Sequence, residues 1–472
     1  MTGKVSLLGL LERVYPDRRD RYGYTVLSRS RAIRAIRRSG DELLRRLIES
    51  DLLDILVAAQ AILLPKVVRD RQDKYVFLVQ KRIRPAIVPS EWSPTMFADA
   101  ALLILRAEIA LCPKELTVDD PHPWNILFDG DKPYIVDMGA FNVAGTGLHW
   151  SAKSDTGIWP ASSIFNAFFL NAVALSAAGR AHYVRRALTD WTPLPGSDTA
   201  LLLLKNPATL LSFLAIRLQT VIFRVAWRLL TPIASAPRKI RLKSAYLSTL
   251  DRHIQRMRSR IVQRMARTTI EAGADHSAGA MEAIVTLNDR HPSRRLLVFG
   301  ASRITVDHIH AATTGALLVV SPDEALIDQI YQRALGRMAV AVMDLRSPTP
   351  GAGPSNRWIT PALERFRSDV GIFFFDLEEL VIEKCLTVSE LVQAADKLSE
   401  TAALIIFTKL SADNTISGRN YGQTTDQLLL ACMQQNFDGS EVRFEVIYND
   451  HREMAVTFER LSQAYSDHAS KK

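Results

Sequence analysis

Three polar residues in the first third of the chain have the types and the spacing of a phosphotransferase site. Asp120 is followed five residues later by Asn125, and Asp137 ends the short stretch PYIVD. In kinase-like folds such an Asp accepts the hydroxyl proton, the Asn binds a metal, and the second Asp binds the metals that bridge the phosphates. The segment therefore predicts a kinase-like fold around these residues.

The other parts of a phosphotransfer site do not accompany them. No glycine-rich loop precedes residue 95, and no Val-Ala-x-Lys strand supplies a phosphate-binding lysine, although Lys66 and Lys81 are present. His122 and Trp124 also place bulk beside the expected base. We therefore expect a structural or binding role for this kinase-like remnant, with active phosphotransfer as the weaker alternative.

A different pattern begins at about residue 294. Apolar runs alternate with helical patterns such as residues 324–335 and 388–398, and the runs are LLVFG, GALLVVS, MAVAVMDL, GIFFFD and AALIIFTKL. Continuous apolar strands separated by helices predict a parallel sheet that is buried on both faces. Such sheets bind ligands at the carboxyl ends of their strands.

Length and composition place these two regions in separate domains. The chain has 472 residues, 47% of them hydrophobic and 23% charged, whereas one domain usually holds about 100 to 200 residues. We predict an α/β protein with a kinase-like α+β domain over residues 1–195, a basic helical connector over 196–290 and a Rossmann-like domain over 291–472. An apolar helix over 95–112 should lead into the kinase-like segment.

The formal net charge of +9 favours anionic partners. Arg217, Arg224 and Arg228 recur at intervals of seven and four in an otherwise apolar helix, and further arginines share one face of residues 252–267. Either helix could lie on a membrane surface or meet an anionic partner. The alternative is a connector helix with a solvated basic side. No motif predicts specific nucleic-acid recognition.

The cysteines and the uncharged segments bear on location. Cys112, Cys385 and Cys432 lie far apart without any CxxC spacing, which predicts buried free thiols and no metal site. The uncharged residues 156–179 are long enough to span a bilayer, but their Asn and Ser residues favour a buried core helix. With no secretory signal at the first residues, we expect a cytoplasmic protein, with peripheral membrane association as an alternative.

Long stretches of the chain resemble one bacterial family. WNILFDGDKPYIVDMGAF, the preceding VPSEWSPTMFADAALLILRAEIAL, and the region from LLVFGASR to AVTFERL are similar to class I methyltransferases that use S-adenosylmethionine (SAM) and carry an N-terminal kinase-like domain. The group includes host-specific nodulation proteins of rhizobia. The resemblance implies SAM as the cofactor, a small-molecule or carbohydrate acceptor, and a nodulation role by analogy.

The resemblance also assigns residues. In this family a glycine-rich loop after the first strand admits the methionine part of SAM, an acid after the second strand binds the ribose, and an acid after the third meets the adenine. It places the following residues at those positions: Gly300 and Ser302, then Ser321 and Asp323 with Glu324 as a substitute, then Asp344. Asp376, Glu378 and Glu379 end the fourth strand, and any of them could be the catalytic base, although the family commonly has two histidines there.

The first loop departs from the family pattern. Ser302, Arg303 and Ile304 stand where small residues would admit the cofactor, and Arg303 would place a cation beside the sulfonium. We therefore expect SAM binding to be weak or lost. The alternative function is a catalytically inactive pseudo-methyltransferase that serves as a binding or interaction protein. For Asp323 and Glu324, capping of a helix N-terminus is the competing interpretation.

Overall fold

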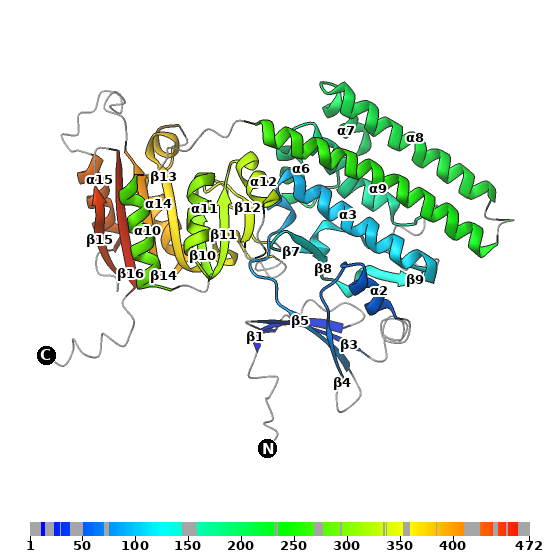
Figure 1. The fold of residues 1–472 in the computed structure, drawn as a ribbon, viewed down its shortest axis with the longest axis horizontal. Coiled ribbons are helices and arrows are strands. Elements are labelled where there is room, and N and C mark those ends of the chain that lie inside the picture. Colours follow the sequence, from blue (N-terminus) through cyan, green and yellow to red (C-terminus); the bar gives the residue numbers. More distant parts are fainter. Residues whose placement is uncertain are drawn as a thin grey trace, which may run out of the picture. The chain divides into compact units, whose positions relative to one another are not determined.

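The computed structural model divides the chain into two compact units, Met1–Arg267 and Thr268–Lys472 (Figure 1). The residues that the structure describes are 11–14, 23–28, 30–37, 51–69, 75–143, 158–230, 232, 235–268, 277–292, 295–333, 336, 338–352, 359–383, 385–409, 425–437, 442–449 and 452–460. The boundary falls inside the predicted connector 196–290, so the helices of that segment are shared between the two units.

The first unit begins with a small antiparallel sheet. Its strand order is β1-β2-β3-β5-β4, and every neighbouring pair is antiparallel. The strands are β1 (Leu11–Val14), β2 (Gly23–Ser28), β3 (Arg31–Arg37), β4 (Lys66–Arg69) and β5 (Tyr75–Lys81), with the short helix α2 (Leu52–Ala58) between β3 and β4.

A buried helix connects this sheet to the segment that carries Asp120. Helix α3 (Pro94–Leu111) confirms the predicted apolar helix, and Pro94 occupies its first position, where a missing N–H leaves no intrahelical bond unmade. After it, β6 (Leu116–Val118) pairs with β9 (Phe141–Val143), and β7 (Ile126–Asp129) forms a hairpin with β8 (Lys132–Ile135). The predicted site residues lie on the loops between these strands.

The uncharged segment is part of the core of the first unit. Helix α4 (Ser162–Phe165), a π-helical turn (Asn166–Leu170) and α5 (Asn171–Ala177) are buried over nearly their whole length. The side-chain amide of Asn171 donates to the carbonyl oxygen of Leu194 at 2.6 Å, which satisfies a polar group inside this core. The prediction of a buried core helix is therefore confirmed.

Four further helices complete the first unit: α6 (Ala181–Thr189), α7 (Gly196–Leu203), α8 (Pro207–Leu230) and α9 (Ala236–Arg267). In Figure 1, α8 and α9 run beside each other as a long pair, and α9 also packs on α3 and α5. Its buried side chains recur at helical spacing, from Tyr246 and Leu250 through Ile254 to Ile261. The basic helix is therefore built into this unit along one side.

The second unit contains a seven-stranded sheet in the order β12-β11-β10-β13-β14-β16-β15. The strands are β10 (Arg295–Phe299), β11 (Ala316–Ser321), β12 (Met338–Val342), β13 (Ser368–Asp376), β14 (Ser399–Thr408), β15 (Val442–Asn449) and β16 (Glu453–Arg460). The first five are mutually parallel, as predicted, whereas β16 is antiparallel to both of its neighbours.

Helices connect the parallel strands. They are α10 (Ala278–Arg290), α11 (Arg303–Ala312), α12 (Glu324–Gln332), α13 (Ala362–Arg365), α14 (Val388–Leu398) and α15 (Thr425–Phe437). Residues inside β10, β11 and β13 are buried almost without interruption, which requires cover on both faces of the sheet. The predicted Rossmann-like α/β architecture is thus present in this unit, and numbered from β10 the strand order 3-2-1-4-5-7-6 is the order expected of a class I methyltransferase domain.

Candidate functional site

The strand order of the second unit defines one edge where a ligand can bind. The chain leaves β10 toward β11 and β12 on one side, and later returns to β13 and β14 on the other. The order therefore reverses between β10 and β13, and in open α/β sheets ligands bind outside the carboxyl ends of the strands at such a point. All the predicted cofactor and base residues follow the carboxyl ends of β10, β11, β12 and β13.

Gly300 lies directly at this reversal. Its backbone has a φ of +75°, its N–H donates to the carbonyl oxygen of Val320 at 3.0 Å, and an added Cβ would come within 2.5 Å of the carbonyl oxygen of Phe374. A side chain is excluded both by the left-handed backbone and by the neighbouring strand. The glycine is therefore required for the close approach of β10 and β13.

Ser302 and Arg303 form the start of α11. The Ser302 hydroxyl accepts a hydrogen bond from the backbone nitrogen of Thr305 at 3.2 Å, so Ser302 is the N-cap of the helix. The Arg303 guanidinium donates to Oε1 of Gln329 on α12 at 3.3 Å. This contact holds the Arg303 side chain against α12, on the β11 and β12 side of the reversal.

The two predicted ribose residues follow β11. Ser321 is buried, and its hydroxyl accepts from the backbone nitrogen of Asp323 at 3.1 Å. One carboxylate oxygen of Asp323 accepts from the backbone nitrogens of Ala325 and Leu326 at 2.8 and 3.1 Å. Asp323 is therefore the N-cap of α12, in agreement with the competing interpretation, and its role toward a ribose stays a prediction.

Asp344 follows β12 and has a cationic neighbour that the sequence analysis missed. Arg346 donates from Nη2 to one carboxylate oxygen of Asp344 at 2.6 Å and from its backbone nitrogen to the other at 2.9 Å. Hydrogen bonding and charge from Asp344 raise the pKa of the Arg346 guanidinium above its ordinary value, and the charge of Glu379 adds to this. The spacing Asp-x-Arg at a strand end was the signal available in the sequence.

The three predicted base residues share the end of β13. Asp376 is exposed, and its carboxylate accepts from the backbone nitrogen of Glu379 at 3.1 Å. Glu378 is half-buried and begins a π-helical turn that ends at Glu383. Because the charge of Glu379 acts on Arg346, the loops after β12 and β13 approach each other above the sheet edge. The structure thus joins the predicted adenine contact and one predicted base through Arg346.

The kinase-like segment is also brought together. The Asn125 amide donates to the backbone oxygen of Asp120 at 3.0 Å, and the backbone nitrogen of Val136 donates to the Asn125 carbonyl oxygen at 2.8 Å, next to Asp137. The Asp137 carboxylate accepts from the backbone nitrogen of Gly139 at 2.8 Å and so caps a 3-10 turn. Within the described part of the chain, no group of three His, Cys, Asp or Glu side chains could hold a metal ion.

Aromatic side chains pack beside this segment. The Trp124 ring stacks on Trp191 with centroids 4.3 Å apart, and the His122 ring lies 4.8 Å from Phe168. His122 also contacts the Asp120 carboxylate, with Nε2 and Oδ1 3.3 Å apart. The bulk expected beside Asp120 therefore belongs to a packed aromatic cluster.

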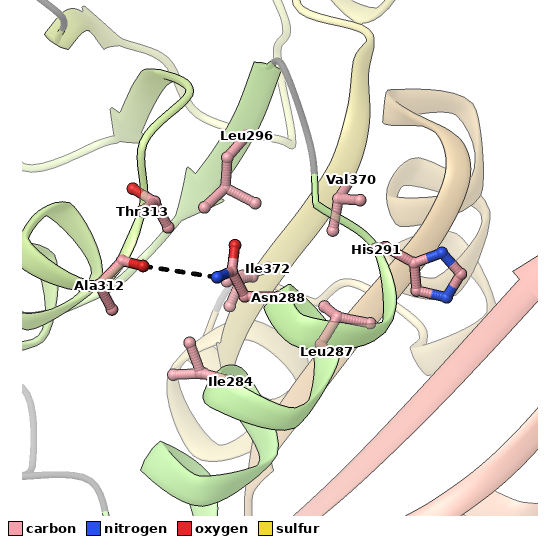
Figure 2. A pocket seen from close by; sticks show the side chains of 9 residues that line it. All are labelled: Ile284, Leu287, Asn288, His291, Leu296, Ala312, Thr313, Val370 and Ile372. Carbon is pink, nitrogen blue, oxygen red and sulfur yellow. Dashed lines mark hydrogen bonds between the residues drawn. The ribbon is translucent and has the colours of Figure 1, made fainter.

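A pocket in the second unit lies away from these residues. It is lined by side chains of α10 and by the first parts of β10 and β13, including Ile284, Leu287, Leu296 and Val370 (Figure 2). The Asn288 amide crosses it to the carbonyl oxygen of Ala312 at 3.4 Å. This pocket is at the amino ends of the strands, and none of the predicted cofactor residues lines it.

Comparisons with known proteins place the chain near methyltransferase structures only distantly. No protein-family model and no curated protein matches it. The O-methyltransferase TomG from Streptomyces achromogenes, solved with SAM, is 13% identical, with 43% of this chain and 95% of that chain covered and a TM-score of 0.27. An O-methyltransferase from Bacillus cereus, solved with SAH, is 13% identical, with 43% and 88% covered and a TM-score of 0.27.

A SAM-dependent methyltransferase from Aquifex aeolicus is 8% identical, with 42% of this chain and 98% of that chain covered and a TM-score of 0.27. Such low values do not assign the chain to a family. The resemblance to nodulation proteins and the kinase-like fold of the first unit stay predictions, while the second unit has the α/β sheet described above.

Proposed function

We propose that the second unit binds SAM at the carboxyl edge of β10 to β13 and that the protein transfers a methyl group to a small-molecule or carbohydrate acceptor. One observation carries this proposal: four parallel strand ends meet at a reversal of strand order, and each is followed by polar residues of the expected type. Asp344 would meet the adenine amine, and Ser321 with Asp323 would face the ribose.

The chemistry asks little of the protein beyond alignment. SAM supplies an electrophilic methyl group on a sulfonium. The acceptor oxygen forms the new bond to carbon as the carbon–sulfur bond breaks, and the sulfur leaves with that electron pair as a neutral thioether. The acceptor proton passes to a carboxylate, for which Asp376, Glu378 and Glu379 are available at the end of β13.

The non-catalytic alternative has specific support. Asp344 is already hydrogen-bonded to Arg346, Asp323 caps α12, and Ser302 with Arg303 fills the first turn of α11. Each of these contacts uses a group that the cofactor would need, or places bulk near it. A weakened cofactor site, or a binding domain without catalysis, is consistent with this arrangement.

Calorimetry of the full chain with SAM and SAH tests the proposal. We expect weak binding in the wild type and tighter binding after Ser302→Gly with Arg303→Gly, because glycine retains most of the N-cap stability while it removes both side chains. Adding Asp344→Ala should remove most of that gain. Tight SAM binding by the wild type that Asp344→Ala does not change would show that the site is misplaced. If no variant binds SAM or SAH, the non-catalytic alternative is favoured.

For the first unit we propose a kinase-like fold that serves structure or binding. A five-stranded antiparallel sheet precedes the helical part, and the loop residues Asp120, Asn125 and Asp137 follow in the kinase-like order. Asn125 and Asp137 hydrogen-bond to neighbouring backbone groups, which supports a role in holding the loops.

A further inference from the structure

Helix α8 exposes an apolar stripe on the side that faces away from its own unit. The stripe, which we call the α8 stripe, consists of Leu211, Leu214, Leu218, Ile222, Val225 and Leu229, whose exposed fractions run from 47% to 70%. The intervals of three and four residues place all six on one face of the helix. A surface helix of a water-soluble unit normally has polar residues on this face.

The opposite face of α8 is the one that packs on the first unit. Thr209, Phe213, Ile216 and Thr220 are buried there, about half a turn away from the stripe. The α8 stripe is therefore additional to the core contacts. Only 22% of the most apolar 18-residue window of this helix is buried, although its mean hydropathy of 1.5 is high enough for a membrane span.

Arginines border the α8 stripe on both sides. Arg217 and Arg228 are exposed and lie along one border of the stripe on α8 itself. On the other border Arg260 of α9 reaches α8, where its Nη1 donates to the Ser212 hydroxyl at 2.8 Å. Arg256 follows the same face of α9 and is also exposed.

The charge of this region is far from that of the remaining chain. Residues 196–267 contain fourteen Lys and Arg against two Asp and no Glu, whereas the remaining residues contain slightly more acidic than basic side chains. The positive charge of the protein is thus concentrated on the helices that carry and border the α8 stripe. An apolar face with a cationic border is complementary to a surface with anionic headgroups over hydrocarbon.

We propose that the α8 stripe and its arginine border dock the protein onto an anionic membrane surface, with α8 lying in the plane of the interface. The apolar side chains would enter the boundary between headgroups and acyl chains, and the guanidinium groups would meet lipid phosphates. This docking surface is independent of the proposed methyl transfer, because every residue that forms it belongs to the first unit.

Two other occupants fit less well. A second copy of the chain would bring two strongly cationic regions together, and like charges at close range repel. A helix that crosses the bilayer would have to leave its contacts with α9, and it would carry arginines into the hydrocarbon at about 2.5 to 3.5 kcal/mol each. Arg224 is also held to the first unit, since its Nη2 donates to the Ser162 hydroxyl at 3.0 Å.

Flotation of the full chain with lipid vesicles tests the proposal. The wild type should bind vesicles of phosphatidylcholine with about 30% phosphatidylglycerol, bind pure phosphatidylcholine at least about tenfold more weakly, and lose affinity as salt rises. Leu214→Gln with Leu218→Gln and Ile222→Gln should lower binding at least about tenfold. The matched control is Val285→Gln with Ile304→Gln, which changes two equally exposed apolar residues of the second unit and should bind as the wild type does.

The charged border is tested separately. Arg217→Gln with Arg228→Gln should lower binding to the anionic vesicles about tenfold and leave the weak binding to neutral vesicles unchanged. Arg333→Gln with Arg367→Gln removes two exposed arginines of the second unit and should have no effect. Circular dichroism melts establish that each variant is folded before it is compared.

Three results would overturn the proposal. They are failure of the wild type to bind anionic vesicles, binding that the three glutamines do not weaken, and sedimentation that shows a wild-type dimer which the three glutamines convert to a monomer. The last result would assign the α8 stripe to a second copy of the chain.

Discussion

The Asp344 carboxylate is held by Arg346, with Nη2 and a carboxylate oxygen 2.6 Å apart. This pair occupies the position at which the adenine amine would bind. In Arg346→Gln the carboxylate is released and a cation is removed from the neighbourhood of a cationic cofactor. We expect SAM affinity to rise roughly three- to tenfold in calorimetry, because a charged acceptor becomes available.

Two variants control this experiment. Arg333→Gln breaks a comparable exposed pair, with Asp307, and should leave SAM affinity unchanged. Asp344→Asn in the Arg346→Gln background should cancel the gain. A fall in affinity on Arg346→Gln alone would mean that the arginine contacts the ligand rather than competing for Asp344.

The two glycines Gly300 and Gly336 separate backbone strain from crowding. Both have positive φ, +75° and +44°, but an added Cβ at Gly336 would meet nothing within 4 Å, whereas at Gly300 it would meet the Phe374 carbonyl oxygen. Gly336→Ala should lower the free energy of unfolding by about 1 kcal/mol and Gly300→Ala by about 3 kcal/mol or more. Urea denaturation of the full chain measures both, and equal losses would contradict the close approach at Gly300.

A buried ion pair should stabilise the first unit. Lys243 on α9 and Glu108 on α3 have Nζ and Oε1 2.5 Å apart, and Glu108 also accepts from the Thr117 hydroxyl and the Val118 backbone nitrogen. Lys243→Met leaves the buried carboxylate without its cation and should lower the free energy of unfolding by about 3 to 5 kcal/mol. Adding Glu108→Gln should restore part of the loss. A loss below about 1 kcal/mol for Lys243→Met in urea denaturation would show that the pair is not buried.

The three cysteines should react with iodoacetamide in a fixed order. Cys385 is exposed, contrary to the predicted burial, while Cys112 is buried and Cys432 is partly buried. Burial raises the pKa of the Cys112 and Cys432 thiols, so less of each is thiolate at a given pH and their labelling shifts to higher pH. Peptide mass spectrometry should find Cys385 labelled first, and Cys112 labelled fully only after denaturation. Equal rates for Cys112 and Cys385 in the native chain would be inconsistent with the fold.

The kinase-like segment should not turn over ATP. Asp120→Asn keeps the shape of the side chain, and Asp137→Asn keeps an oxygen that can accept from the Gly139 nitrogen. Both variants should retain the fold and the SAM binding of the wild type, whereas Asp137→Ala should lose about 1 kcal/mol of stability with its cap. The measurement is ADP release in the presence of Mg²⁺. Turnover by the wild type that Asp120→Asn abolishes would establish phosphotransfer.

The parts of the fold that the sequence predicts are those with local signals. Strands β10 to β14 are apolar runs bounded by turn residues, and α14 begins after Thr387 with a capping box that includes Glu390. Strand β15 was missed because half-exposed and exposed residues alternate along this edge strand, including Arg443 and Glu445. Its pairing depends on β16 rather than on its own composition.

The site was predicted at the level of strand ends and not of contacts. The position of Asp344 after the third strand follows from a local pattern. Its partner Arg346 and the approach of Glu379 depend on how two loops more than thirty residues apart meet above the sheet. On α8 the sequence likewise locates Arg217 and Arg228 but not which side of the helix packs on its unit, since both sides are apolar.

The position of β16 constrains how the second unit can form during synthesis. β16 pairs with β14 on one side and β15 on the other, so β15 leaves the ribosome before it has a partner in the sheet. Until residues 453–460 emerge, the aliphatic strand β14 has an open edge of unpaired backbone groups, which is a template for pairing with other chains. A nascent chain that stalls before Glu453 is therefore prone to aggregation and exposed to proteases, and its sheet closes only when the last of its strands has been released.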